Sequence, residues 1–330
     1  MKKNIVSLIL VLAIASTGLT AACGGKYSGS SQSISIGVTV SASTVVFFTA
    51  ENQHYFAENG IDFTLNTYGT GPSAIADLEN DKIDVACTSE YQMVAGALAN
   101  ENISIVTNIS TSYVTDLVAL TDKGITNVAD LKGKNIGVLF GSISQFYLGQ
   151  FLELNGINIG NVNQVNISAA QDMAALANGS VDAVVTQDPY ESQIDQQYPN
   201  GTISWSVQSG QAVNNVLICR NDWIQQNPAL LKRFLEALNQ SENYIISHPT
   251  EAKTILQQNY TSSNEYVNSE WPDYQFSLSL DESLIAAMED EARWTISNNL
   301  TTATQVPNFL NYIYTNGLKA VEPDSINIIQ

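Results

Sequence analysis

Residues 76–90 read ADLENDKIDVACTSE, and residues 174–188 read AALANGSVDAVVTQD. Seven positions of the two stretches carry identical or similar residues at a constant separation of 98: Ala76, Leu78, Asn80, Ile83, Asp84, Thr88 and Glu90 against Ala174, Leu176, Asn178, Val181, Asp182, Thr186 and Asp188. Two earlier blocks repeat in the same order, since Ile36-Gly37-Val38 returns at 136–138 and Asn59-Gly60-Ile61 returns at 155–157. Three repeated blocks that keep the same order predict two related α/β lobes.

Each copy alternates between strand-like and helix-like spacing of its apolar residues, with turn residues between the segments. Asn59-Gly60 is a typical left-handed helix end, and Pro72 stands where a helix tolerates proline, in its first turn. The expected elements of the first copy are strand 33–40, a helix that ends at Asn59-Gly60, strand 61–67, helix 73–78 and strand 83–87. Strands joined through helices predict a parallel sheet with right-handed crossovers.

This arrangement predicts where a ligand binds, because open parallel sheets bind ligands at the carboxyl ends of their strands. The loops at those ends are small and polar in both copies. If the lobes face each other, the loops form two walls of one cleft. The candidate ligand-binding residues are Ser41, Ser43, Thr44, Tyr68, Gly69, Thr70, Thr88, Ser89 and Glu90 from the first copy, with Ser142, Ser144, Gln145, Thr186, Gln187, Asp188 and Tyr190 from the second.

The composition and the absence of certain motifs exclude several classes of function. The chain of 330 residues holds 32 Asp and Glu against 13 Lys and Arg, and no basic cluster suggests a nucleic-acid partner. His54 and His248 stand alone and no Cys-x-x-Cys occurs, so we expect neither a metal nor a cofactor. No dinucleotide fingerprint, P-loop or nucleophile elbow is present. Glu90 and Asp188 remain open between an acid–base pair and a ligand-binding or loop-bracing role, and the second reading is favoured.

The N-terminus has the layout of an export signal, with Lys2 and Lys3 before an apolar run and small residues after it. We assign residues 1–22 to a signal peptide. Thr20-Ala21-Ala22-Cys23 resembles the lipobox of prokaryotic lipoproteins, although Leu is commoner where Thr20 stands. The resemblance implies acylation of Cys23, a flexible tether over 23–32 and anchoring at the outer face of the cell membrane, against the alternative of a plain signal peptide.

The remaining cysteines, Cys87 and Cys219, both end apolar, strand-like runs. Isolated strand cysteines are usually small buried hydrophobic residues, whereas exported proteins often oxidise paired thiols. We expect two buried thiols and leave a disulfide open.

Several segments together resemble the solute-binding lipoproteins of ABC importers, of the sulfonate, nitrate, taurine and thiamine-pyrimidine-precursor type. They are Tyr55 to Ile61, Ile83 to Ala86, Ala129 to Val138, Gly141 to Ser144 and Asp172 to Leu176. The resemblance implies a type II periplasmic-binding-protein fold, in which two Rossmann-like lobes close about a hinge. It also implies a small-molecule solute, ABC permease subunits as partners, a monomer and no catalytic residues.

The resemblance further implies how the chain is divided. Lobe one would comprise 33–118 and 219–330, including a helical C-terminal tail, and lobe two would comprise 119–218. The chain would cross between them along two strand-like runs that contain the hinge residues Asp116 and Asn215.

The identity of the solute follows less directly. The family holds anionic groups at the loop equivalent to Gly141 to Ser144. In this sequence, however, the loops expected at the carboxyl ends of the strands carry no Arg or Lys. With Glu90 and Asp188 expected nearby, we favour a neutral, zwitterionic or amine-bearing ligand, taurine or a pyrimidine among them. Two alternatives stay open: a thiamine-pyrimidine-synthase-like or menaquinone-pathway enzyme on the same fold, and a module that presents its ligand to a receptor.

Overall fold

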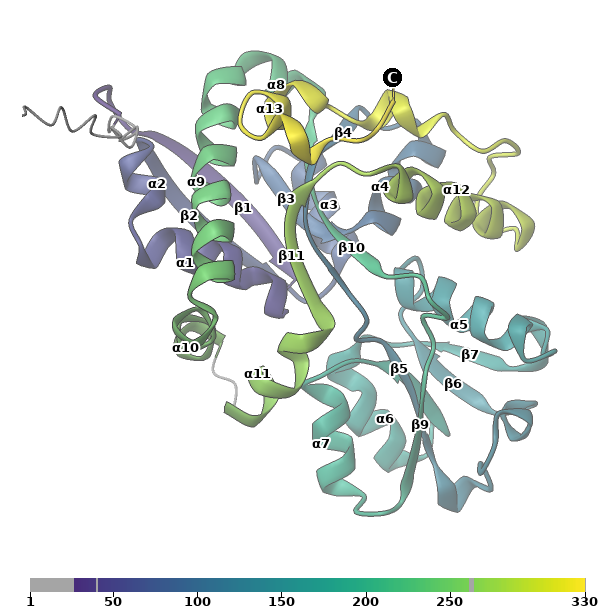
Figure 1. The fold of residues 1–330 in the computed structure, drawn as a ribbon. Coiled ribbons are helices and arrows are strands. Elements are labelled where there is room, and N and C mark those ends of the chain that lie inside the picture. The colour runs from purple at the N-terminus through teal and green to yellow at the C-terminus, as the bar shows by residue number, and fades with distance from the viewer. Residues whose placement is uncertain (1–26, 40, 261–263, 330) are drawn as a thin grey trace, which may run out of the picture.

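The computed structural model describes residues 27–39, 41–260 and 264–329. The expected signal peptide, Cys23 and the first part of the tether lie outside these residues. The described strands form two separate sheets, one in the upper and one in the lower part of Figure 1. We call the six-stranded part lobe one and the five-stranded part lobe two. Within the described residues, no helix has the length and apolar character needed to cross a membrane.

Lobe one is built on the strand order β11-β4-β10-β3-β1-β2. Strands β1, β2 and β3 run parallel, whereas β10 and β4 are antiparallel to their neighbours. The strands are β1 (Gln32–Thr39), β2 (Ile61–Tyr68), β3 (Val85–Ser89), β4 (Ile103–Ser112), β10 (Val213–Arg220) and β11 (Tyr274–Ser279). The helices between the first strands are α1 (Val45–Asn52), α2 (Tyr55–Glu58), α3 (Gly71–Glu79) and α4 (Glu90–Ala99). One helix had been expected up to Asn59, but a left-handed His54 divides it into α1 and α2.

Lobe two has the strand order β7-β6-β8-β5-β9, with β6 parallel to β7 and β8. Its strands are β5 (Asp116–Leu120), β6 (Asn135–Val138), β7 (Asn163–Asn166), β8 (Ala183–Thr186) and β9 (Thr202–Ser206). Its helices are α5 (Ile143–Leu154), α6 (Asp172–Asn178) and α7 (Tyr190–Gln197). The order β7-β6-β8 reproduces β2-β1-β3 of lobe one, which confirms the α/β fold of two Rossmann-like lobes.

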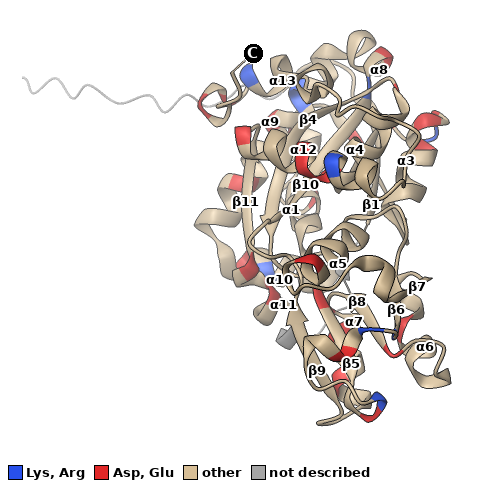
Figure 2. Cartoon of the chain, turned by 90° about the vertical axis from the view of Figure 1, so that its right-hand side faces the viewer, with Lys and Arg blue, Asp and Glu red and all other residues tan. Residues whose placement is uncertain are grey.

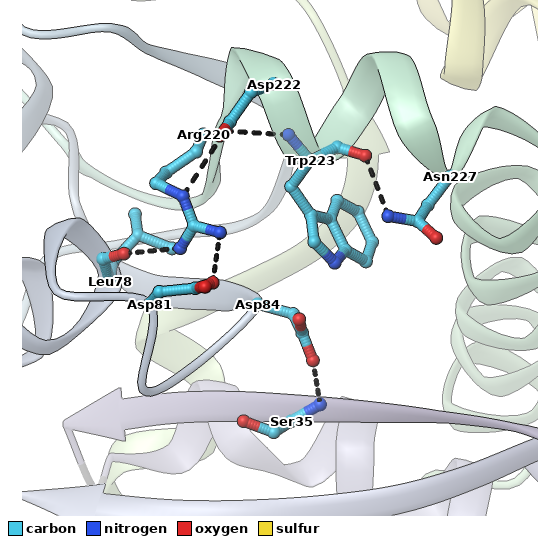
Figure 3. A network of polar contacts seen from close by, with 8 residues as sticks. All are labelled: Ser35, Leu78, Asp81, Asp84, Arg220, Asp222, Trp223 and Asn227. Atoms are coloured by element: carbon cyan, nitrogen blue, oxygen red, sulfur yellow. Dashed lines mark hydrogen bonds and ion pairs between the residues drawn. The ribbon is translucent and has the colours of Figure 1, made fainter.

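The repeated residues perform the same structural task in both lobes. The Asp84 carboxylate accepts a hydrogen bond from the Ser35 amide at 2.8 Å, and Asp182 accepts one from the Asn135 amide at 2.9 Å. Each aspartate thereby ties the segment before its own strand to the neighbouring parallel strand, β1 in lobe one and β6 in lobe two. In lobe one, Arg220 braces the same region by binding the Leu78 carbonyl at 2.7 Å and the carboxylate of Asp81 (Figure 3).

The C-terminal part is mainly helical, as expected, with one addition. Its helices are α8 (Asn221–Gln226), α9 (Pro228–Ser247), α10 (Pro249–Tyr260), α11 (Asn264–Glu270), α12 (Glu282–Ser297) and α13 (Thr315–Lys319). Helix α9 packs against α1 and α2, and α12 packs against α4 and also reaches α5 of lobe two. The sequence reading missed strand β11, which pairs with β4 at the edge of the sheet in lobe one.

The chain crosses between the lobes through residues 113–115 and 207–212, and not along the two strands that had been expected to cross. All of β5 pairs within lobe two and all of β10 within lobe one. The expected boundaries at 118/119 and 218/219 therefore cut through strands. Asp116 and Asn215 instead lie just beyond the two crossings. The Gln208 side chain joins the crossings, since its Oε1 accepts from the amides of Val114 and Thr115 and its Nε2 donates to the Ser112 carbonyl.

The cysteines on β3 and β10 are both buried and free, so no disulfide joins them. Burial raises the pKa of Cys87 to about 12 and also raises that of Cys219. Both side chains belong to the apolar core of lobe one.

Candidate functional site

A cavity of about 120 Å³ lies where the carboxyl ends of the strands of both lobes meet. Its volume is about four times that of one water molecule in the liquid, which is roughly 30 Å³. No lining residue carries a formal charge. The lining residues are Thr39, Ser41, Gly71, Pro72, Thr88, Ser89, Gln92, Ser112, Val114, Thr115, Ser142, Ile143, Gln187, Val213, Asn215 and Tyr274.

Three helices begin at this cavity. Gly71 and Pro72 open α3, Ser89 precedes α4, and Ser142 precedes α5. The side chains of Ser89 and Ser142 do not cap their own helices. Because the first amides of a helix have no intrahelical acceptor and lie at the positive end of the helix dipole, this wall favours a negatively charged or electron-rich group.

Ser112 supplies a polar atom without a partner. It lies at the end of β4, its side chain is almost completely buried, and its Oγ has no hydrogen-bond partner among the described residues. A buried hydroxyl in this state costs about 1–3 kcal/mol relative to one that is hydrogen-bonded. A ligand that accepts or donates a hydrogen bond here would remove that cost.

Gln92 joins the two lobes across the cavity. Its Nε2 donates to the Gly141 carbonyl at 3.1 Å, so a side chain of α4 bonds to the loop before α5. Gly71 allows this close packing, because a Cβ there would lie 2.5 Å from Thr88 Oγ1 and 3.1 Å from Gln92 Cγ. The walls are therefore in contact, and the cavity is that of a closed form.

The structure brings some of the expected residues to the cavity. Those that line it are Ser41, Thr88, Ser89, Ser142 and Gln187, together with the expected hinge residue Asn215. Ser89 and Gln187 are equivalent in the 98-residue register, yet they differ in chemistry. The two lobes therefore present a hydroxyl and an amide at corresponding places in the cavity.

Other expected residues of lobe one form hydrogen bonds within the loops and do not contact the cavity themselves. Ser43 Oγ bonds Ser41 Oγ at 2.6 Å, and Thr44 Oγ1 donates to the Ser41 carbonyl at 2.6 Å. Tyr68 binds Asp77, and Thr70, which follows Gly69, caps α3 by accepting from the Ser73 amide. Ser43, Thr44, Tyr68, Gly69 and Thr70 do not line the cavity.

In lobe two, Gln145 accepts a hydrogen bond from the Gly141 amide and lines a neighbouring pocket of about 420 Å³ instead. Thr186 is buried beside Asp172, whose pKa burial raises to about 7. Ser144 and Tyr190 lie in the first turns of α5 and α7, outside the cavity lining.

Neither of the expected carboxylates reaches the cavity. Glu90 is fully buried and accepts hydrogen bonds from the amide and the Nδ2 of Asn214. Asp188 accepts from the amide and the hydroxyl of Ser192 and so caps the start of α7. The structure does not bring the pair together, which removes the geometry needed for an acid–base pair across the cleft.

Sequence reasoning missed the residues that come from the crossings and the C-terminal tail. Thr115 ends the first crossing, Val213 follows the second, and Tyr274 belongs to β11. Gln92 and Ser112 were also missed. The polar run Ser110-Thr111-Ser112 at the end of β4 was a signal that could have identified Ser112.

Acidic residues gather beside one wall of the cavity, next to the lining residues Thr115, Gln187 and Tyr274. Burial raises the pKa of Glu270 to about 8, with the charges of Asp188, Asp273, Glu191 and Asp116 adding to it. Burial and the Asp116 charge raise the pKa of Glu191 to about 7. Figure 2 shows red acidic segments over both lobes and few blue basic ones. This side of the cavity therefore has a negative potential, opposite in sign to the helix ends.

Two lobes that enclose a small polar cavity at their strand ends form the architecture of type II periplasmic-binding proteins. Residues 41–252 match the family described as NMT1/THI5 like, and the chain belongs to that family. Its structure is similar to that of an alkanesulfonate-binding protein from Xanthomonas axonopodis solved with bound MOPS, with a TM-score of 0.74 and 17% identity over 87% of this chain and 99% of that one.

Relatives by sequence include both binding proteins and an enzyme. A protein of Brucella abortus named as a binding protein is 22% identical over 64% of this chain, and the match spans 66% of its length, just under two thirds. The taurine-binding periplasmic protein of Escherichia coli is 24% identical over 66% of this chain and 68% of its own. A 4-amino-5-hydroxymethyl-2-methylpyrimidine phosphate synthase of Saccharomyces cerevisiae is 20% identical over 63% of this chain and 65% of its own.

Proposed function

We propose that this protein is the extracytoplasmic solute-binding component of an ABC importer and captures a small organic solute with a compact anionic head, such as a sulfonate. The observation that carries the proposal is the charge-free cavity at the first turns of α3, α4 and α5. Amide and hydroxyl donors would hold the head without an arginine or lysine, each helix end contributing about 0.3–1 kcal/mol and up to about 2 when partly buried.

The acidic residues beside Thr115, Gln187 and Tyr274 favour a positive group at the other end of the solute. A zwitterion such as taurine would suit both walls, with its sulfonate at the helix ends and its ammonium group on the side of Asp116 and Glu270. A second negative charge at that end would be repelled. The relative that is named for taurine supports the same class of solute.

Isothermal titration calorimetry with three sulfonates of similar length tests this proposal. We expect taurine to bind more tightly than ethanesulfonate, which lacks the amine, and sulfoacetate to bind most weakly. A ligand at 100 times its dissociation constant also stabilises the protein by about 2.7 kcal/mol, which a thermal-shift assay detects. Binding of none of the three would contradict the proposal, and preferred binding of sulfoacetate would contradict the role of the carboxylates.

We propose a binding role and not a catalytic one, although the family includes enzymes. The described cysteines are poor nucleophiles, because burial holds the pKa of both thiols far above neutrality. The carboxylates at positions 90 and 188 are each held in hydrogen bonds away from the cavity. Recovery of chemically unchanged taurine after prolonged incubation is the expected result, and any turnover would favour the enzyme alternative. Presentation of the ligand to a receptor would be favoured if no permease binds the loaded protein.

We further propose that Cys23 carries a lipid that anchors a monomer to the outer face of the cell membrane, where it delivers solute to permease subunits. The lipobox-like segment Thr20 to Cys23 supports this location. More than one acyl chain is needed for stable anchoring, at about 0.8 kcal/mol for each buried CH₂. In cell fractionation, wild-type protein should sediment with membranes and Cys23→Ser protein should not; a membrane-bound Cys23→Ser variant would refute acylation.

A further inference from the structure

Two buried carboxyl groups lie beside the crossings between the lobes, outside the cavity described above. Glu90 opens α4 and Glu291 belongs to α12, and both side chains are completely buried. Glu90 is held by Asn214, which lies just after the second crossing, at 2.9 Å from its Nδ2. Glu291 Oε1 accepts from Nε2 of Gln211, within that crossing, at 3.0 Å.

Lobe two covers this pair with Tyr147 of α5, whose side chain is 1% exposed. Two atoms in this cluster, Glu291 Oε2 and the Tyr147 hydroxyl, are buried without a hydrogen-bond partner among the described residues. The Gln208 amide approaches the hydroxyl without completing a hydrogen bond. A polar group of lobe two is thus buried within electrostatic reach of the carboxyl pair of lobe one and lacks a hydrogen-bond partner among the described residues.

The charges that act most strongly on the cluster are all acidic. Glu90 and Asp290 act on Glu291, while Glu90 and Glu291 act on Tyr147, near which the neutral Tyr113 also lies. Tyr91 of α4 faces Glu291 and donates to or accepts from Thr295 at 3.1 Å. Two ionised carboxylates in such a site would repel each other while buried, which costs far more than protonating one of them.

We propose that the closed form binds one proton at the Glu90 and Glu291 pair beneath Tyr147, so that closure of the lobes takes up a proton. The protonated oxygen can donate a hydrogen bond within the cluster, which gives the unpartnered Glu291 oxygen or the Tyr147 hydroxyl its missing partner. When the lobes open, Tyr147 moves away with lobe two, water reaches the pair and both carboxyls ionise.

The direction of the linkage follows from the two states. Burial raises the pKa of both carboxyls in the closed form, with the charge of Glu90 adding to the effect at Glu291. In the hydrated, open form a glutamate returns toward its ordinary pKa of about 4.3. At a pH between the ordinary pKa of the open form and the raised pKa of the closed form, the closed form binds more protons than the open form. Rising pH therefore favours opening of the lobes. One proton taken up on closure corresponds to about a tenfold loss of solute affinity for each pH unit.

Small-angle X-ray scattering of the ligand-free protein tests the linkage without any knowledge of the solute. The radius of gyration of the wild type should increase as pH rises from roughly 5.5 to roughly 8. Glu291→Gln, which mimics the protonated acid, should stay compact over that range, and Glu90→Gln serves if the first variant does not fold. Glu282→Gln removes a charge from an exposed position of the same helix and should behave as the wild type.

A radius of gyration that is independent of pH in the wild type, or that changes equally in the wild type and Glu291→Gln, would overturn the proposal. Calorimetry with taurine in buffers of different ionisation enthalpy gives a second readout, with uptake of about one proton expected in the wild type and none in Glu291→Gln. Absence of taurine binding would count against the proposed solute and leave the scattering result to decide the proton.

Discussion

Ser110 and Ser112 lie two residues apart on the same face of β4, yet their hydroxyls have different surroundings. Ser110 Oγ accepts a hydrogen bond from Nδ2 of Asn215 at 3.2 Å, whereas Ser112 Oγ is buried at the cavity without a partner. A satisfied hydroxyl stabilises the folded chain, and an unsatisfied one destabilises it. Ser112 therefore combines burial, a place in the cavity lining and a hydroxyl without a partner among the described residues.

Ser112→Ala should change stability and affinity in opposite directions. Removing the unsatisfied hydroxyl should raise the melting temperature of the empty protein, while the loss of a hydrogen bond of about 0.5–1.5 kcal/mol should weaken taurine binding about two- to tenfold. Scanning and titration calorimetry measure the two effects. Ser110→Ala is the matched control and should lower the melting temperature. A lower melting temperature in Ser112→Ala would show that the hydroxyl has a partner after all.

At the scale of elements, α5 and α12 form a contact between the lobes. Trp294 of α12 lies edge-on to Phe146 with ring centres 5.6 Å apart, and it packs into the apolar core of lobe two. Gly149 of α5 makes room for it, because a Cβ there would lie 2.4 Å from Cζ2 of the indole. The close approach of these helices therefore requires that position 149 has no side chain.

Gly149→Ala should weaken solute binding more than it weakens the fold. The methyl group opposes the closed contact by about 1–3 kcal/mol, whereas alanine stabilises α5 itself by roughly 1 kcal/mol. We expect about a five- to hundredfold loss of taurine affinity with little change in the melting temperature of the empty protein. Adding Trp294→Leu should restore part of the affinity. A loss that the second substitution does not reverse would place the effect within α5.

At the scale of the whole molecule, the formal charge of -19 is accompanied by several buried carboxyls whose pKa is raised. Burial is the first cause at Glu90, Asp172, Glu191, Glu270 and Glu291. For such a group the folded state binds a proton more tightly than the unfolded state does. The stability that it contributes is present at low pH and is lost as pH rises through the folded pKa.

The melting temperature should therefore decrease as pH rises from roughly 4.5 to roughly 8, because each raised group loses about 1.4 kcal/mol of stability for each unit by which its folded pKa exceeds its unfolded pKa. Asp172→Asn should flatten the decrease and melt at a higher temperature than the wild type at pH near 8, because burial raises the pKa of Asp172 to about 7. Glu153→Gln, at an exposed position of α5, should retain the slope of the wild type. A melting temperature that rises with pH would contradict this account.

The sequence alone determined the architecture of both lobes, because the relevant interactions are local or repeat in register. Alternating strand and helix spacing with helix-end glycines predicted a parallel sheet in each lobe, and the repeated Asp84 and Asp182 mark corresponding loops, whereas the strand orders β2-β1-β3 and β7-β6-β8 came from the structure. The loops at the strand ends, with Ser41, Thr88 and Ser142 among them, followed from the same rule.

Only the tertiary structure decided which side chains face the cavity and where the lobes are joined. Glu90 and Ser89 are neighbours in sequence, but the first turn of α4 directs the carboxylate toward Asn214 and leaves Ser89 at the cavity. Tyr274, the first crossing and the start of β10 reach the site from distant parts of the chain, where no local pattern indicates a partner. Side-chain direction and long-range pairing depend on packing between elements, so the sequence defines the lobes and their loops, whereas the fold as a whole defines the site.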